Sequence, residues 1–145
     1  MARIGDVMNL RLVAVAPDES VQVAIARMLE EEVGSVAVCD GSRLVGIFTE
    51  RDVLHIAGRN GGELADVRIG DVMTTTLVTA APDDDVVAAA RLMGERRIRH
   101  LPVVQDDNVL GMIGIRDVLR VLVESLWREH DEGARDTARD LLRGR

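Results

Sequence analysis

The chain has 145 residues, of which 47% are hydrophobic and 30% charged. This is the composition of a soluble globular domain and not of a disordered segment. A net charge of −7 and only two aromatic residues argue against nucleic acid and anionic membrane as partners. No apolar run approaches the roughly 20 residues that a membrane helix needs. The single cysteine excludes an internal disulfide and favours a location in the reducing cytoplasm.

The elements expected in the first half of the chain follow an opening segment that closes at Met8. Apolar residues at strand and helix spacing, separated by proline, glycine and acidic residues, predict a strand, a helix, two strands and a second helix. In chain order these are a strand at 12–15, a helix that follows Pro17 and ends near 32, strands at 35–39 and 44–48 around an Asp-Gly-Ser turn, and a helix from about 50.

The second half repeats the first with an offset of 65 residues. A comparison of residues 4–54 with residues 69–119 finds 20 identities at 51 positions without a gap. The same elements are therefore expected again, as a strand at 77–80, a helix that ends near 97, strands at 100–104 and 109–113, and a helix from about 115. A duplicated unit of this size usually buries its apolar face against its twin. The predicted division is a first repeat at 1–60, a linker at 61–68, a second repeat at 69–127 and a helical tail at 128–145.

The last helix of the second repeat is unusually apolar. Seven of the ten residues in 118–127 are large and apolar, a wider stripe than a core-facing helix needs. One explanation is a homodimer that buries on the order of 1,600 Å² or more through helices, with Trp127 as an anchor. The other is that the tail breaks near Gly133 and folds back over the stripe. The tail residues that would cover it are Ala134, Ala138, Leu141 and Leu142.

Two segments carry a resemblance to a known family: Gly-Ile-Phe-Thr-Glu-Arg-Asp at 46–52 and Ile-Arg-His-Leu-Pro-Val-Val at 98–104. Each repeat also opens with Asp-Val-Met and has Pro-Asp before its first helix. Over about residues 4–125 the chain resembles a cystathionine-β-synthase (CBS) domain pair, or Bateman module. The resemblance implies an α/β (α+β) fold of two tandem CBS units, each strand-helix-strand-strand-helix, packed through their sheets with pseudo-twofold symmetry. It also implies two clefts between the repeats that hold adenosine ligands: AMP, ADP, ATP, NAD or S-adenosylmethionine.

Thr49 and Asp52 are the strongest candidates for ligand contact from the residues themselves. Thr49 ends a predicted strand, and Asp52 falls in the first turn of the next helix. A carboxylate there can accept both hydroxyls of a ribose, and the free amides of the helix start can meet a phosphate. The alternative is structural: Thr49 caps the helix and Asp52 complements its dipole.

The resemblance assigns further residues to the same, better site. It implies that Arg99, His100 and Arg116 contact phosphate. It also implies that the base lies on apolar side chains: Ile47, Leu77, Val78 and Pro102.

The second site should be weaker, because the second repeat has Gly114 where the first has Thr49. The positions that match Arg99 and His100 are Gly34 and Ser35, which carry no positive charge. By resemblance this site is built from Asp117, Val13, Met112 and Arg51.

The predicted function is a small non-catalytic regulatory module that binds an adenosine nucleotide and changes conformation. The alternative is a protein-interaction module without nucleotide. No nucleophile lies beside a base in sequence, so an enzyme is not expected. A zinc site is not expected either, because His55, His100 and His130 lack ligand spacing with Cys39. Such a regulatory module would act on a separate, regulated protein.

Overall fold

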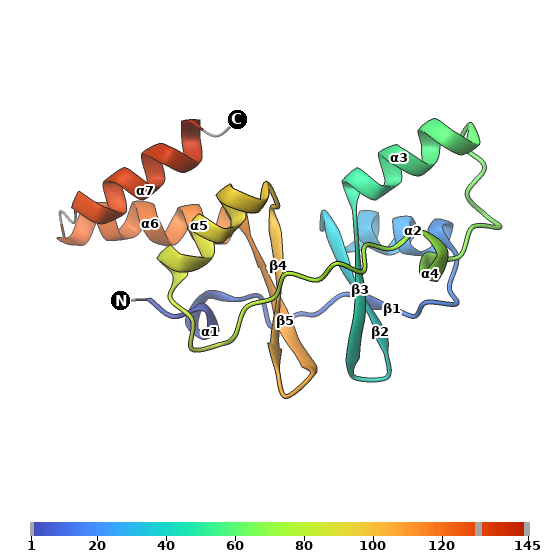
Figure 1. The fold of residues 1–145 in the computed structure, drawn as a ribbon, viewed down its shortest axis with the longest axis horizontal. Coiled ribbons are helices and arrows are strands. Elements are labelled where there is room, and N and C mark those ends of the chain that lie inside the picture. Colours follow the sequence, from blue (N-terminus) through green and yellow to red (C-terminus); the bar gives the residue numbers. More distant parts are fainter. Residues whose placement is uncertain (1, 130–131, 144–145) are drawn as a thin grey trace. The chain divides into compact units, whose positions relative to one another are not determined.

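A computed structural model describes residues 2–129 and 132–143 of the chain (Figure 1). In chain order the elements are α1 (Ile4–Val7), β1 (Ala14–Val15), α2 (Val21–Glu31), β2 (Ser35–Asp40), β3 (Arg43–Thr49), α3 (Glu50–Asn60), α4 (Ile69–Val72), α5 (Val86–Arg96), β4 (His100–Gln105), β5 (Asn108–Gly114), α6 (Ile115–Glu129) and α7 (Glu132–Arg143). The mixed α+β class and the order strand-helix-strand-strand-helix of the first repeat are confirmed.

The chain forms two compact units that do not coincide with the two sequence repeats. The first-repeat unit consists of Arg11–Leu77 with Asp107–Val109. The second-repeat unit consists of Met1–Leu10, Val78–Asp106 and Leu110–Arg145. Each unit therefore contains the opening segment of the other repeat.

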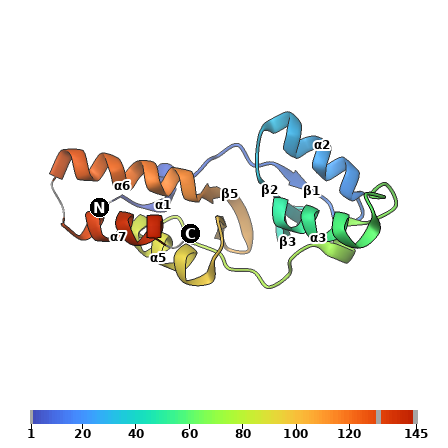
Figure 2. The ribbon, with the colours of Figure 1, turned by 90° about the horizontal axis from the view of Figure 1, so that it is seen from above.

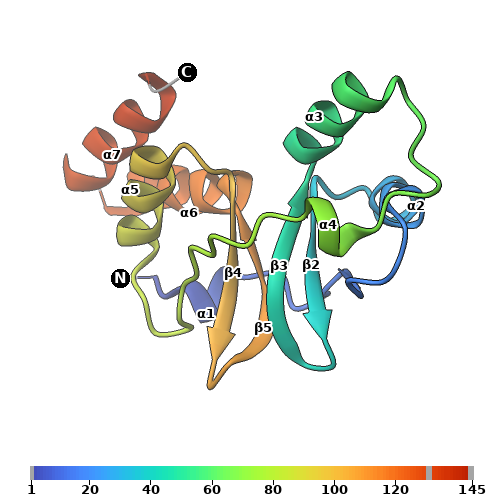
Figure 3. The same cartoon turned by 45° about the vertical axis from the view of Figure 1, so that its right-hand side comes forward.

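The first-repeat unit has three paired strands, β1, β2 and β3, with α2 packed against β2 and α3 against β3. β1 runs parallel to β2, and β2 pairs antiparallel with β3, with a bulge between Val38 and Cys39. Figure 3 shows β2 beside β3. Five successive residues of β2, 35–39, are buried, so both faces of this strand are covered. Phe48 of β3 has no exposed surface and packs in one cluster with the buried residues of α2.

The first helix of each repeat begins and ends in the same way. The Ser20 hydroxyl accepts from the Val23 N–H at 3.2 Å, and an Asp85 carboxylate oxygen accepts from the Val87 N–H at 3.0 Å. Such caps satisfy helix amides that have no partner within the helix. Both helices end at a residue in the left-handed region, Glu32 and then Arg97. The predicted helix ends near 32 and 97 are thus confirmed.

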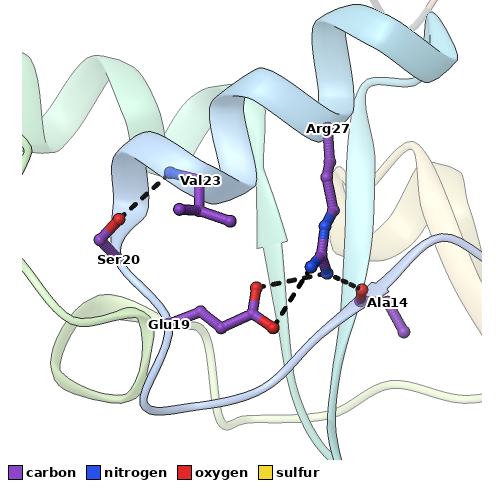
Figure 4. A network of polar contacts seen from close by, with 5 residues as sticks. All are labelled: Ala14, Glu19, Ser20, Val23 and Arg27. Carbon is purple, nitrogen blue, oxygen red and sulfur yellow. Dashed lines mark hydrogen bonds and ion pairs between the residues drawn. The ribbon is translucent and has the colours of Figure 1, made fainter.

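A polar network ties β1 to α2 in the first-repeat unit (Figure 4). The Arg27 guanidinium donates to the Ala14 carbonyl at 2.7 Å and pairs with the Glu19 carboxylate at 3.2 Å. Arg27 lies on α2, so the arginine ties this helix to the strand beneath it. The matching residue of the second repeat is Leu92, which packs against an apolar core instead.

The second-repeat unit has a β4–β5 hairpin but lacks the strand expected at 77–80. There, Ala80 forms only an isolated bridge to Val103. Pro102 explains this absence: in the first repeat the matching Ala37 donates its N–H to the Val13 carbonyl at 3.0 Å, whereas proline has no N–H to donate. The hairpin turn itself has positive φ at Asp106 and Asp107, which aspartate tolerates better than most residues.

The opening segments pair with the opposite repeat through equivalent hydrogen bonds. In the second-repeat unit, the Ile4 N–H donates to the Asp84 carbonyl at 2.9 Å and the Gly5 N–H to the Pro82 carbonyl at 2.8 Å. The first-repeat unit has the same two bonds, displaced by 65 residues, from 69 to 19 at 2.9 Å and from 70 to 17 at 2.8 Å. Ile4 and Ile69 are both fully buried by this arrangement.

The tail folds back, as the second of the two explanations for the apolar stripe predicts. α7 packs against α5 and α6, and Ala138 and Leu141 contact the apolar core (Figure 2). Leu126 also packs against that core. Trp127 remains 82% exposed.

The break predicted near Gly133 is not at this residue, because Gly133 lies within α7. The side chains of residues 134 and 142 lie outside the described part of the chain.

Candidate nucleotide-binding site

The best-formed polar cluster surrounds Asp52 in the first-repeat unit. β3 ends at Thr49, and Asp52 lies in the first turn of α3, as predicted. One Asp52 carboxylate oxygen accepts from the Thr49 N–H at 2.9 Å and from the Thr49 hydroxyl at 3.3 Å. The aspartate therefore caps the start of its own helix by accepting the Thr49 N–H, whereas the structural alternative from sequence gave the cap to Thr49 and only a dipole role to Asp52.

Thr74 is a member of this cluster that sequence reasoning missed. Its hydroxyl donates to the other Asp52 carboxylate oxygen, Oδ1, at 3.2 Å. The residue arrives there because the opening segment of the second repeat belongs to the first-repeat unit, where Thr74 exchanges two backbone bonds with Ile47 (3.0 and 2.9 Å). The available signal was a polar residue directly after Met in both opening segments, Asn9 and Thr74.

The Asp52 carboxylate has acceptor capacity left over for a ligand. An ionised carboxylate offers about four lone-pair sites, and three donors within the protein use it at 3.3 Å or less. Two of these donors are hydroxyls, which can rotate to another acceptor. The cluster can therefore receive a ribose hydroxyl without losing the Thr49 N–H bond that caps α3.

The start of α3 is less open to phosphate than the sequence suggested. The Glu50 amide, which was expected to be free, donates to the Gly34 carbonyl at 3.1 Å. The second repeat has the same bond, from the Ile115 amide to the Arg99 carbonyl at 2.8 Å. The first amide of each of these two helices therefore already has a backbone partner and is not free to bind an anion.

The predicted residues of the better site divide between the two units. Ile47, Thr49, Asp52 and Leu77 belong to the first-repeat unit, and Val78, Arg99, His100, Pro102 and Arg116 belong to the second-repeat unit. Within the second-repeat unit, Arg99 and Arg116 are exposed, whereas Pro102 is buried. A Cβ placed on Gly114 would lie 3.7 Å from His100 and 3.8 Å from the Arg99 carbonyl, so these residues are neighbours.

The weaker site has a plainer cluster around Asp117, on α6. One Asp117 carboxylate oxygen accepts from the Gly114 N–H at 3.2 Å, the same bond that Asp52 makes to Thr49. Arg120 lies 3.6 Å from the other oxygen. The Gly114 φ angle is ordinary and a Cβ would fit without a clash, so the backbone does not require glycine there. Of the other predicted members, Met112 is in the same unit, while Val13 and Arg51 are in the first-repeat unit.

Cys39 and the histidines form no second chemical site in the part of the chain that is described. Burial raises the pKa of the Cys39 thiol, which disfavours the reactive thiolate. Among residues 2–129 and 132–143, no three His, Cys, Asp or Glu side chains lie together as metal ligands would. His130 lies outside these ranges. The helices within them are too short or too polar to cross a membrane.

The sequence model of the family described as "CBS domain" matches the chain twice, at residues 4–59 and 69–124. The chain is similar to the CBS domain-containing protein CBSX3, mitochondrial, from Arabidopsis thaliana, with 37% identity over 120 residues. That alignment covers 79% of this chain, which spans little more than half (56%) of the relative.

Solved structures agree with this match. The crystal structure of a CBS domain, NE2398, has a TM-score of 0.79 and 28% identity, and the match covers 85% of this chain and 99% of that one. The crystal structure of CBSX2 in complex with AMP has a TM-score of 0.73 and 29% identity, with 86% and 98% covered. Two family matches, in tandem and over most of the sequence, show that this chain belongs to the CBS domain family as a pair of CBS repeats.

Proposed function

We propose that this chain is a small regulatory module that binds an adenosine nucleotide of the AMP, ADP or ATP class and signals by changing conformation. The observation that carries the proposal is the Asp52 cluster, in which a carboxylate is held by Thr49 and Thr74 and keeps acceptor capacity for a ribose. The similarity to CBSX2, whose crystal structure is a complex with AMP, supports the same ligand class.

In this proposal Asp52 binds the ribose, and Arg99, His100 and Arg116 bind phosphate. The base lies against Ile47, the pair at 77–78 and Pro102. The module is not catalytic, and it acts on a regulated protein as part of a homodimer. A buried, unpaired Cys39 fits a reducing compartment, and we place the protein in the cytoplasm, although the relative CBSX3 is described as mitochondrial.

A thermal-shift panel of AMP, ADP, ATP, NAD and S-adenosylmethionine tests this proposal. A nucleotide that binds only the folded chain, at 100 times its dissociation constant, adds about 2.7 kcal/mol to the free energy of unfolding. For a chain of this length the melting temperature should rise by roughly 5 to 10 °C. Guanosine monophosphate is the control, because it has the same ribose and phosphate but a different base. No shift with any adenosine ligand, together with flat calorimetric titrations, would exclude nucleotide binding.

A protein-interaction module without nucleotide is the second candidate. It is favoured by one feature, the loss of the hydroxyl and of both cations at the second site, where Gly114, Gly34 and Ser35 stand. The same thermal-shift panel separates the two candidates, since this one predicts no response to any of the five ligands.

A further inference from the structure

The two oxygens of the Asp52 carboxylate are held by different donors. Oδ2 accepts from the Thr49 N–H at 2.9 Å and from the Thr49 hydroxyl at 3.3 Å. Within the described part of the chain, the one donor whose nearest carboxylate oxygen is Oδ1 is the Thr74 hydroxyl, at 3.2 Å. Each carboxylate oxygen offers about two lone pairs, so most of the acceptor capacity left for a ligand lies on Oδ1.

The bond from the Thr49 N–H does not by itself fix the direction of the carboxylate. It holds Oδ2, but rotation about the last side-chain bond of an aspartate has only a broad preference. Oδ1 could therefore swing about the capped oxygen if nothing else held it. The Thr74 hydroxyl is the donor that stops this rotation. Thr74 is exposed and Asp52 is half-buried, so solvent and a ligand can reach the cluster.

Thr74 is itself held by the sheet. Its N–H donates to the Ile47 carbonyl at 2.9 Å, and its carbonyl accepts from the Ile47 N–H at 3.0 Å. Ile47 lies in β3 and is buried. The side chain of threonine is branched at Cβ and has few rotamers, so the position of its hydroxyl follows from the backbone. These residues all belong to the first-repeat unit, so the arrangement is complete within it.

The second repeat shows that the fold does not require a threonine at this position. Asn9 matches Thr74, and it exchanges backbone bonds with Met112 at 2.9 and 3.3 Å. The bridge therefore forms with either residue. Asp117 keeps the bond that caps its helix, but its other oxygen lies 3.6 Å from the Arg120 guanidinium. A hydroxyl that holds the second carboxylate oxygen is thus a feature of the first repeat.

We infer that Thr74 is a positioning residue that makes the proposed site selective for ribose over 2′-deoxyribose. With both oxygens held, and once the Thr49 hydroxyl has rotated away, the Asp52 carboxylate accepts both ribose hydroxyls. A nucleotide without the 2′-hydroxyl leaves a fixed acceptor without a partner, and a site built in this way rejects such an analogue. Without Thr74 the carboxylate can turn toward the one remaining hydroxyl, so selectivity falls. This inference rests on the proposed function and adds the residue that decides its sugar.

Calorimetric titration with AMP and ATP, each beside its 2′-deoxy form, tests the selectivity. The wild-type chain should bind the ribose form of its ligand about tenfold more tightly. Thr74→Val should weaken binding of the ribose form by about fivefold and hardly change that of the 2′-deoxy form. Thr74→Ser keeps the hydroxyl and should restore the selectivity. The matched control is Thr75→Val, at an exposed neighbour that has no bond to Asp52 within the described residues, and it should keep the wild-type ratio.

A double variant separates a positioning role from direct contact with the ligand. In the Asp52→Ala chain, titrated at millimolar nucleotide, Thr74→Val should cause no further loss of affinity, because Thr74 acts through Asp52. A further loss there would overturn the positioning role. So would an unchanged ratio in Thr74→Val, or a loss that Thr74→Ser does not restore. A wild-type chain that binds both sugars equally would overturn this inference alone, whereas one that binds none of the four nucleotides would overturn the proposed function with it.

Discussion

Replacing Asp52 with alanine is expected to weaken the binding of the preferred nucleotide by about a hundredfold. In the proposed site the carboxylate accepts two ribose hydroxyls through charge-assisted hydrogen bonds, and the loss of both costs on the order of 3 kcal/mol. Isothermal titration with the nucleotide that gives the largest thermal shift measures this effect. Thr74→Val should weaken binding less, because it removes only a hydroxyl that holds Asp52 in place.

Asp117→Ala is the matched control for this prediction. Both aspartates accept the N–H of the residue three positions earlier, at 2.9 and 3.2 Å. Both substitutions should therefore cost about 1 kcal/mol of stability through the lost cap. Only Asp52→Ala should also lower affinity strongly. Equal losses of affinity would contradict the difference between the two sites that Thr49 and Gly114 indicate.

Gly111→Ala is expected to lower the free energy of unfolding by about 3 kcal/mol, the upper end for overpacking. A Cβ at this position would lie 2.5 Å from the carbonyl oxygen of Asn9. That oxygen cannot move aside freely, because Asn9 and Met112 exchange backbone hydrogen bonds at 2.9 and 3.3 Å. The melting temperature should fall by roughly 10 °C, which differential scanning calorimetry can measure.

Alanine variants at two other glycines test whether the clash with the Asn9 carbonyl causes the expected loss of stability. Gly46 is the matching position in the first repeat, but there the nearest atom to a new Cβ is the Met73 sulfur, at 2.5 Å. A methionine side chain is flexible, so Gly46→Ala should cost less than Gly111→Ala. Gly58→Ala on α3 meets nothing within 4 Å and should stabilise the chain by up to about 1 kcal/mol. If the Gly111→Ala protein were as stable as the Gly58→Ala protein, the Asn9 carbonyl would have moved aside and the expected clash would be contradicted.

The helices and hairpins could be predicted from sequence because their signals are local. Ser20 and Asp85 mark helix starts by the amides that they cap, and the turns between the paired strands contain glycine or aspartate. The prediction of a strand at 77–80 is wrong because it depends on a residue in another segment of the chain. Its apolar pattern is correct, but the backbone donor that it needs is missing at Pro102, in another segment.

The candidate site was predictable only in part. Thr49 and Asp52 belong to one short motif, so their spacing places them together. Thr74 is 22 residues away from Asp52. The 65-residue repeat does not indicate whether an opening segment packs with its own repeat or with the other one. Similarly, the spacing of apolar residues identified a stripe on α6, but only the position of α7 shows that Leu126 is covered and Trp127 is exposed.

The exchange of opening segments has a consequence for proteolysis. The residues at 61–63, 65 and 66 are exposed, so a protease can reach this part of the chain. A cut there would leave Ile4 on one fragment and its core on the other, and the same holds for Ile69 in reverse. Neither fragment could leave without opening a cavity of isoleucine size in the other, at a cost of several kcal/mol. We therefore expect the nicked protein to run as an intact molecule until it is denatured, and the two fragments to complement each other when they are co-expressed.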